Sequence, residues 1–259
     1  MLYSGLCSVT FRKLSPEQVV ELSARAALAG IEWGGDVHVP HGQVDVARRV
    51  RDLTAGAGLA CPSYGSYYKL AESEPAGLAF AAVLDSAVAL GARTIRVWSG
   101  NRHSRDADAA YRKVVEDDAR RIGQLAGRHG ITISCEFHQK SLTDTPESTA
   151  ALMKATADAG LRTYWQPPLK MAPAERLAGL RAVLPWLTHL HVEAYSEGDE
   201  PQQVALAEGE GPWLDALRLT ASIGGNRYCY LEFVPGGTPD SFLRDAGTLI
   251  AWLQRINKE

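Results

Sequence analysis

The sequence predicts a single (β/α)8 barrel spanning residues 1–259, and three observations support this fold class. The length of 259 residues is close to the roughly 250 typical of such barrels. Short apolar, β-branched or aromatic segments alternate with Ala-, Leu- and Arg-rich amphipathic segments, which indicates parallel strands joined by helices. Eight such units favour a closed sheet, because closure leaves no exposed edge. The rival fold, an open doubly wound sheet, usually has a Gly-rich turn after its first strand, and none follows here.

The expected strands are eight short segments, and most follow a helix end and a Gly. In chain order they cover residues 3–9, 30–33, 59–64, 94–98, 131–136, 162–166, 188–193 and 228–233. The phrases ALAGIEW, ALGARTIRVW, RHGITISCE and DAGLRTYWQ repeat one pattern of helix end, Gly and strand. Ser15-Pro16-Glu17 and Thr145-Pro146-Glu147 predict two helix starts, each with a capping hydroxyl before a Pro at the first helical position.

The composition argues against a nucleic-acid or membrane partner. The formal net charge is -3 and the isoelectric point is about 6.2, whereas a phosphate-backbone binder needs a concentrated basic face. No stretch reaches the 18 or more apolar residues of a membrane span, and the N-terminus lacks a secretory signal pattern. The cysteines, Cys7, Cys61, Cys135 and Cys229, form no CxxC pair. We therefore expect reduced thiols in a cytoplasmic protein.

Polar residues end four consecutive strands of the expected barrel. They are Glu136, Gln166, His191 and Glu232. The carboxyl ends of barrel strands carry the active site, and neighbouring strands place these side chains side by side around the rim. Alternation along each strand allows the two carboxylates, the imidazole and the amide oxygen to point inward together. This ligand set predicts a divalent-metal site that suits Mn²⁺, Mg²⁺ or Co²⁺, with Zn²⁺ less favoured because no thiolate takes part.

Simpler interpretations apply to each of these residues alone. A single Glu at a strand end is usually a solvated loop residue. A single His in an apolar strand is usually a packed core histidine, which is the interpretation we adopt for His189. The joint occurrence on four successive strand ends favours the metal site.

Four motifs carry a resemblance to a known family. They are ISCEFHQKSLTDTPES after the fifth strand, HLHVEAY on the seventh, ALAEGEGPW after it, and YLEFVPGG on the eighth. Through them, essentially the whole chain resembles the xylose isomerase-like TIM barrel superfamily. That superfamily includes the sugar phosphate isomerase/epimerase family, inosose dehydratase and endonuclease IV.

The resemblance implies a ligand set of Glu, Asp, His and Glu from these four strands, as is typical of sugar epimerases in the superfamily. Glu136, His191 and Glu232 match it residue by residue. Gln166 stands where an Asp is usual, and Leu169 stands where a His often follows. The loss of one negative charge should weaken metal affinity or change metal preference. His138 is a candidate fifth ligand that would partly compensate, or else a substrate contact.

The resemblance also implies a metal-dependent sugar isomerase or epimerase acting on a small carbohydrate. The metal, with Mn²⁺ the leading expectation, would bind a carbonyl oxygen and stabilise an enediolate as a Lewis acid. Glu136 and Glu232 would abstract and return the proton next to the carbonyl as general base and acid.

A further set of residues is expected to line the sugar pocket. They are Glu32, Trp33, His38, Trp98, His103, Lys140, Trp165 and Glu193. Trp33 could equally be barrel packing, and Lys140, like Lys170, could be a solvated loop lysine. Arg96 is in phase with Trp98 and either points inward or makes a structural ion pair.

Several other functions remain open at this point. One is a metal-dependent lyase or dehydratase on keto-sugars or 3-keto glycosides, similar to C-glycoside deglycosidases. Another is a non-catalytic sugar-binding subunit, and a third is an unrelated barrel enzyme. A DNA-repair nuclease of the endonuclease IV type is disfavoured by the acidic charge and by its need for many more His and Asp ligands. A homo-oligomer is compatible with the sequence.

Overall fold

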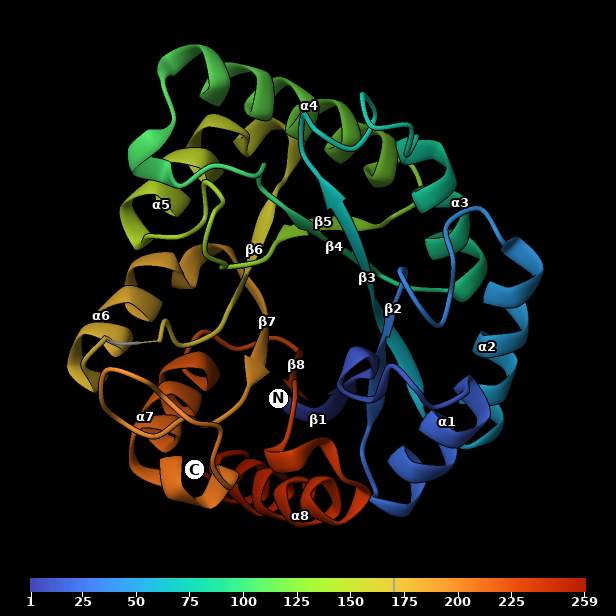
Figure 1. The fold of residues 1–259 in the computed structure, drawn as a ribbon, viewed down its shortest axis with the longest axis vertical. Helices are drawn as coiled ribbons and strands as arrows, with labels where there is room; N and C mark the ends of the chain where they lie inside the picture. The colour runs from blue at the N-terminus through green and yellow to red at the C-terminus, as the bar shows by residue number, and fades with distance from the viewer. Residues whose placement is uncertain (170) are drawn as a thin grey trace.

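The computed structural model describes residues 1–169 and 171–259, and its described residues form eight parallel strands closed into a barrel within a ring of helices (Figure 1). The strands follow one another in chain order around the barrel, and the last strand pairs in parallel with the first. The predicted (β/α)8 fold class is therefore confirmed.

The elements alternate along the whole chain. The strands are β1 (Leu2–Cys7), β2 (Gly30–Gly34), β3 (Ala60–Lys69), β4 (Thr94–Trp98), β5 (Thr132–Cys135), β6 (Arg162–Trp165), β7 (Leu187–Val192) and β8 (Arg227–Leu231). The α-helices are α1 (Pro16–Arg25), α2 (Val44–Gly56), α3 (Phe80–Leu90), α4 (Ala109–Gly127), α5 (Pro146–Ala155), α6 (Pro173–Val183), α7 (Glu210–Ala221) and α8 (Pro239–Ile256). Short 3-10 helices are η1 (Ser8–Phe11), η2 (Ser104–Asp106), η3 (Ala157–Ala159), η4 (Leu184–Trp186), η5 (Leu206–Gly209) and η6 (Pro235–Gly237).

Each predicted strand overlaps an observed one, but the strand ends differ in a way that matters for the site. β5 and β6 end one residue early and β8 ends two residues early, so Glu136, Gln166 and Glu232 are the first residues after these strands. The backbone N–H of Glu136 still donates to Val97 at 2.9 Å, and that of Glu232 donates to Val192 at 3.1 Å. These two residues therefore keep the inward direction of the strand although they lie outside it.

β3 is longer than expected, because it ends at Lys69 rather than at residue 64. Its register against β4 shifts between Gly65 and Tyr68. The irregularity lets the strand continue past the barrel wall.

Both capped helix starts are confirmed. The Ser15 hydroxyl accepts a hydrogen bond from the backbone of Gln18, whose side chain accepts one from Ser15 in return, forming a capping box at α1. The Thr145 hydroxyl accepts from the backbone of Ser148 at the start of α5. The loop after β5 is therefore anchored on a defined helix start close to Glu136.

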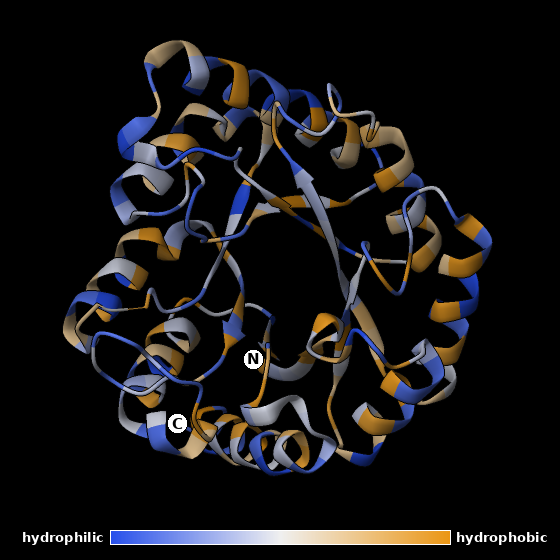
Figure 2. Ribbon diagram, in the orientation of Figure 1, coloured by the Kyte–Doolittle hydropathy of each residue, from blue (hydrophilic) through white to orange (hydrophobic). Residues whose placement is uncertain are grey.

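Apolar packing fills the layer between the barrel and the helices. In α8, Phe242, Ala246, Leu249 and Leu253 recur at helical spacing and are all buried. Figure 2 shows the outer helices carrying both hydrophobic and hydrophilic residues, as this one-sided burial requires. Among the described residues, no helix combines the length and the apolar character needed to cross a membrane.

The lumen of the barrel is polar and aromatic instead. At its base, His189 receives a hydrogen bond from the backbone of Tyr228 and lies 3.3 Å from the Thr94 hydroxyl. Burial lowers the pKa of His189 to about 3, so it is a neutral core histidine as interpreted from the sequence. Tyr164 and Tyr230 stack above it with ring centroids 6.4 Å apart. These rings form a floor beneath the strand ends that carry the polar residues.

The tight packing of the lumen generates a stability prediction at Gly65. A Cβ at this position would lie 2.7 Å from Nη2 of Arg96 and 3.1 Å from Oε1 of Glu32. We expect Gly65→Ala to lower the free energy of unfolding by about 1–3 kcal/mol, because overpacking would displace a buried side chain. Urea denaturation measures this.

The matched control is Gly56→Ala at the end of α2, where a Cβ would have no neighbour within 4 Å. This variant should be stabilised by about 0.4–1 kcal/mol through reduced freedom of the unfolded chain. Equal stability of the two variants would contradict the packing described for Arg96.

Candidate active site

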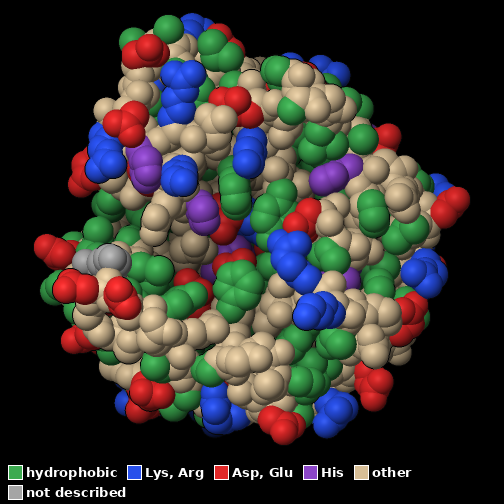
Figure 3. All heavy atoms as spheres, viewed as in Figure 1, with side chains coloured by type: hydrophobic (Ala, Val, Ile, Leu, Met, Phe, Trp, Pro, Cys, Tyr) green, Lys and Arg blue, Asp and Glu red, His purple; other side chains and the backbone are tan. Residues whose placement is uncertain are grey.

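Four predicted ligand residues meet around one nitrogen atom, Nδ1 of His191. Oε2 of Glu232 lies 2.8 Å from it, Oε1 of Gln166 lies 2.9 Å from it, and Oε1 of Glu136 lies 3.6 Å from it. Glu136, His191 and Glu232 are buried and offer ligand atoms that all lie within 4.8 Å of one another. In the space-filling view, acidic and His side chains lie in a hollow at the centre of this barrel face (Figure 3).

Glu136 is oriented by donors on one of its two oxygens. Nη1 of Arg96 and Nε1 of Trp98 both donate to Oε2 of Glu136. Burial opposes ionisation, but Arg96 and His191 hold the pKa of Glu136 at about 2. The carboxylate is therefore ionised, and its other oxygen faces His191.

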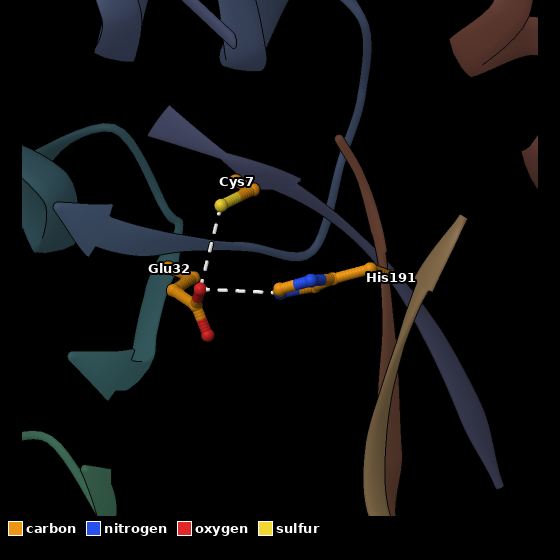
Figure 4. A group of neighbouring side chains, drawn as sticks. All are labelled: Cys7, Glu32 and His191. Atoms are coloured by element: carbon orange, nitrogen blue, oxygen red, sulfur yellow. Dashed lines mark hydrogen bonds and ion pairs between the residues drawn. The ribbon is translucent and has the colours of Figure 1, made fainter. Parts of the chain in front are cut away.

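The opposite ring nitrogen of His191 points toward a second buried carboxylate, that of Glu32 (Figure 4). Its Nε2 lies 3.3 Å from Oε1 of Glu32, which also accepts from Nε of Arg96 at 2.8 Å. The other oxygen of Glu32 accepts from Ser63 at 2.9 Å and from Tyr164 at 2.8 Å. Because carboxylate and amide oxygens only accept, both ring nitrogens of His191 carry a proton when no cation is bound. A cation on the Nδ1 side would replace that proton, while Nε2 would keep its bond to Glu32.

Figure 4 also shows Cys7 beside Glu32, with its Sγ 3.3 Å from Oε1. Cys7, Glu32 and His191 form a second group with the spacing of metal ligands. Two observations argue against a metal there. The donors on Glu32 already use both of its oxygens, and burial, together with Glu32 and Glu232, raises the pKa of the Cys7 thiol so that it stays protonated. This group is better described as a support for His191.

The balance of buried charges in the lumen shows whether the cluster could accept a metal cation. Within the described residues, the buried carboxylates at this level are those of Glu32, Glu136 and Glu232, and the buried guanidinium is that of Arg96. Two negative charges are thus unbalanced. Burial disfavours protonation of His191, but Glu232 and hydrogen bonds to Cys7, Glu136 and Glu232 raise its pKa well above its ordinary value. The cluster attracts positive charge, and its oxygen and imidazole donors suit a divalent cation.

A cavity of about 790 Å³ opens directly above this cluster. Its wall carries aromatic and cationic side chains: Trp98 stacks on His138 with centroids 4.6 Å apart, and Nζ of Lys69 lies 4.9 Å from the Trp98 ring centre. Glu136, Gln166 and Glu232 lie at its floor. The cavity therefore gives a small molecule access to the candidate ligands.

Strained backbone concentrates at this cavity. Within the described residues, five non-glycine residues have positive φ, and Tyr67, Lys140 and Phe233 among them line it, with φ of 55°, 56° and 61°. Such strain usually persists where the surrounding structure holds a side chain for function. Phe233 directly follows Glu232, and its N–H donates to the Thr10 hydroxyl at 2.9 Å.

The structure brings some of the expected substrate contacts to this cavity. Trp98, His138, Lys140 and Glu193 line it. His138 is not part of the ligand cluster: its Nδ1 lies 2.6 Å from the carbonyl oxygen of Gln139, so its placement fits a substrate contact rather than a fifth ligand. Burial and the nearby Glu232 carboxylate raise the pKa of Glu193 to about 8. Lys170 lies outside the described residues.

Other expected substrate contacts lie elsewhere. Trp33 is fully buried and donates to the Thr54 hydroxyl of α2 at 3.2 Å, so it packs between barrel and helix. His38 is buried, with its ring nitrogens at Ser8 and at the carbonyl oxygen of Leu14.

Three more of these candidates also lie outside the cavity wall. Glu32 is fully buried beneath the cavity floor, where it supports His191. His103 pairs with Asp144 at 3.1 Å outside the cavity wall. Trp165 faces a separate, neighbouring cavity. Alternation along the strand explains Trp33 and Trp165, because each precedes or follows an inward-facing residue.

Several residues of the site were not predicted from the sequence. Arg12, directly after η1, and Tyr67 and Lys69, in the extended end of β3, line the cavity, and Cys7 supports His191 from β1. Cys7 could have been found as the last residue of the first strand. Tyr67 and Lys69 could not, because the irregularity in β3 shifts the strand end.

The fold and this cluster define a (β/α)8 barrel with a candidate divalent-metal centre at the carboxyl ends of its strands. A family model described as xylose isomerase-like TIM barrel matches residues 20–241. The chain therefore belongs to the xylose isomerase-like TIM barrel family.

One curated relative is a 3-dehydroshikimate dehydratase from Bacillus anthracis, 26% identical over 126 residues. The match spans 44% of this chain and 43% of that enzyme, less than half the length of either.

Solved structures extend the likeness over the whole barrel. A probable 3-DHS dehydratase involved in petrobactin synthesis from Bacillus anthracis has a TM-score of 0.79 at 20% identity, covering 96% of this chain and 99% of that chain. A xylose isomerase-like TIM barrel protein from Mycobacterium smegmatis in complex with magnesium has a TM-score of 0.74 at 16% identity, covering 98% and 97%. A D-psicose 3-epimerase has a TM-score of 0.70 at 15% identity, covering 98% and 99%. At these identities the likeness establishes the fold.

The buried charges generate a prediction at Arg96. We expect Arg96→Met to lower the free energy of unfolding by at least about 3 kcal/mol, because Glu32 and Glu136 would both lose their buried partner. Urea denaturation of the metal-free protein measures this.

Arg49→Met is the control, since Arg49 pairs with Glu17 at 3.0 Å and both side chains are about half exposed. That change should alter stability by no more than about 1 kcal/mol. If the two variants lose the same stability, Arg96 does not hold the buried carboxylates as described.

Proposed function

We propose that the chain is a divalent-metal-dependent sugar isomerase or epimerase that moves a proton on a carbon next to a carbonyl of a small carbohydrate. The observation that carries this proposal is the convergence of Glu136, Gln166, His191 and Glu232 around one point at the floor of an open cavity. Membership of the xylose isomerase-like family supports it.

The residues that would hold the metal are the predicted ones. Oε1 of Glu136, Oε1 of Gln166, Nδ1 of His191 and Oε2 of Glu232 face one another. A bound divalent ion would polarise the substrate carbonyl and stabilise the negative charge that forms beside it. Mn²⁺ is the leading candidate, and a solved structure of the same fold in complex with magnesium supports a hard cation.

The two glutamates differ in how freely they can accept a proton. Oε2 of Glu136 is held by the guanidinium of Arg96 and the indole of Trp98, so proton transfer to it opposes two donors. Oε1 of Glu232 has only the Cys7 thiol, with Sγ at 3.7 Å, as a partner within the described residues. We therefore infer that Glu232 abstracts the proton and, once protonated, returns it to the substrate, while Glu136 remains ionised and stabilises positive charge at the site.

A metal-dependent lyase or dehydratase is the second candidate. Proton abstraction would be the same, but a leaving group on the next carbon would then depart as water or an aglycone. A specific observation favours it: both the curated relative and one structural neighbour bear the name of a 3-dehydroshikimate dehydratase. The amide at Gln166 in place of the usual Asp is a further reason to keep this candidate.

Solvent deuterium exchange tests both candidates in one assay. With Mn²⁺ present, we expect deuterium at the carbon next to the carbonyl of one member of a panel of ketoses, inososes, 3-keto glycosides and 3-dehydroshikimate. A rearranged sugar would indicate an isomerase or epimerase, and loss of water or aglycone would indicate a lyase. Glu232→Gln should slow exchange by about 100-fold or more, because the general base is lost.

Glu17→Gln, an exposed change on α1, serves as the control and should retain full exchange. Absence of both exchange and loss of water or aglycone across the panel in a metal-loaded protein would contradict the enzyme proposal and favour a sugar-binding subunit.

The amide at position 166 generates a separate prediction on metal affinity. Gln166→Asp should tighten Mn²⁺ binding by about tenfold or more, because a third carboxylate joins the ligand set. Isothermal titration of chelator-treated protein measures the dissociation constant. Gln18→Asp at the surface is the control. If Gln166→Asp binds Mn²⁺ no more tightly than this control, residue 166 is not a metal ligand.

A further inference from the structure

A second cavity, of about 380 Å³, lies beside the reaction cavity. It is formed by the ends of β6 and β7 and by α6 and α7, outside the barrel lumen. The two cavities share the residues Pro167, Leu169, Glu193 and Tyr195. A molecule in the second cavity would therefore lie next to the candidate metal centre without contacting its ligands.

The deep wall of this cavity consists of flat apolar surfaces. Trp165 and Trp213 are 3% and 5% exposed and pack edge to face with centroids 6.0 Å apart. The remaining apolar wall comes from Leu177, Val204 and Pro212. The volume lies within the range of small-molecule sites, and indole and proline faces favour a planar ring.

Two donors in this wall lack an acceptor. Nε1 of Trp165 and Nε of Arg176 are buried atoms with no hydrogen-bond partner among the described residues. The other indole differs, because Nε1 of Trp213 donates to the carbonyl oxygen of Glu193 at 2.8 Å. Buried donors are rarely left unsatisfied, so an unpaired N–H in a cavity wall indicates a place for a ligand acceptor.

The polarity of the wall selects the ligand further. Trp165 and Arg176 supply donors at the buried wall, whereas Glu197 and Glu208 lie at the exposed margin. Further acceptors come from Glu193 and Tyr195, on the side that this cavity shares with the reaction cavity, and from Ser196, so the polar atoms of the wall that lack a partner are donors. A ring with a carbonyl or phenol oxygen would satisfy the indole N–H and cover the apolar faces at the same time.

We propose that this cavity binds a small aromatic group that carries an oxygen acceptor, with the acceptor on Nε1 of Trp165. This site goes beyond the proposed function, because binding of a ligand in this cavity would require neither the metal nor proton transfer. Its position makes the ligand a neighbour of whatever occupies the reaction cavity.

Titration of the full chain with acetophenone, in the presence of a chelator, tests the site. We expect saturable binding by isothermal titration, weakened about tenfold by Trp165→Phe, which keeps a ring but removes the donor. Ethylbenzene, which has the same shape without the oxygen, should bind wild type and Trp165→Phe with the same affinity. Leu177→Trp should abolish binding of both probes by filling the cavity.

Val88→Trp is the control, since Val88 is exposed on α3 away from the cavity, and it should bind acetophenone as wild type does. If Leu177→Trp does not fold, Trp165→Phe decides the question. Absence of acetophenone binding, or binding that is unaffected by Trp165→Phe, would overturn the proposal. Because the chelator removes divalent metal, acetophenone binding does not depend on the proposed metal-dependent reaction. The aromatic site and the proposed function can therefore be contradicted separately.

Discussion

The buried guanidinium of Arg96 is the interaction on which the site depends. It donates to Glu32 on one side and to Glu136 on the other, and thereby joins β2, β4 and the end of β5 inside the lumen. Glu32 in turn accepts from the Nε2 proton of His191, which directs the opposite nitrogen of the ring toward the other ligand atoms. This chain of contacts supports Glu136 together with the indole of Trp98, and it supports the side of the His191 ring that faces away from Glu232 and Gln166.

The same arrangement gives the lumen an excess of negative charge that favours binding of a cation. One guanidinium cannot balance the carboxylates of Glu32, Glu136 and Glu232, and burial makes each unbalanced charge costly. A proton on His191 relieves part of this imbalance, and a divalent ion would relieve all of it. The neutral amide of Gln166 then limits the surplus to the charge of one dication, whereas an Asp at this position would add a further negative charge.

Much of this could be predicted from the sequence, because a barrel converts strand order into spatial order. Four polar strand ends in succession were enough to place Glu136, Gln166, His191 and Glu232 together. The direction of a side chain at a single strand position was harder to predict. Trp33 and Trp165 face the helices, and Glu32 points inward but lies beneath the cavity, where it accepts hydrogen bonds rather than contacting substrate. Tyr67 and Lys69 depend on an irregularity in β3 that local sequence does not reveal.

The position of a bound metal would show whether these four residues form the metal site. Crystals grown with Mn²⁺, with data collected for anomalous scattering, would locate the ion without assumptions about the reaction. We expect an anomalous peak within coordination distance of Glu136, Gln166, His191 Nδ1 and Glu232. A peak between Cys7 and Glu32 on the other side of His191, or no peak at the cluster in protein shown to bind Mn²⁺, would contradict it.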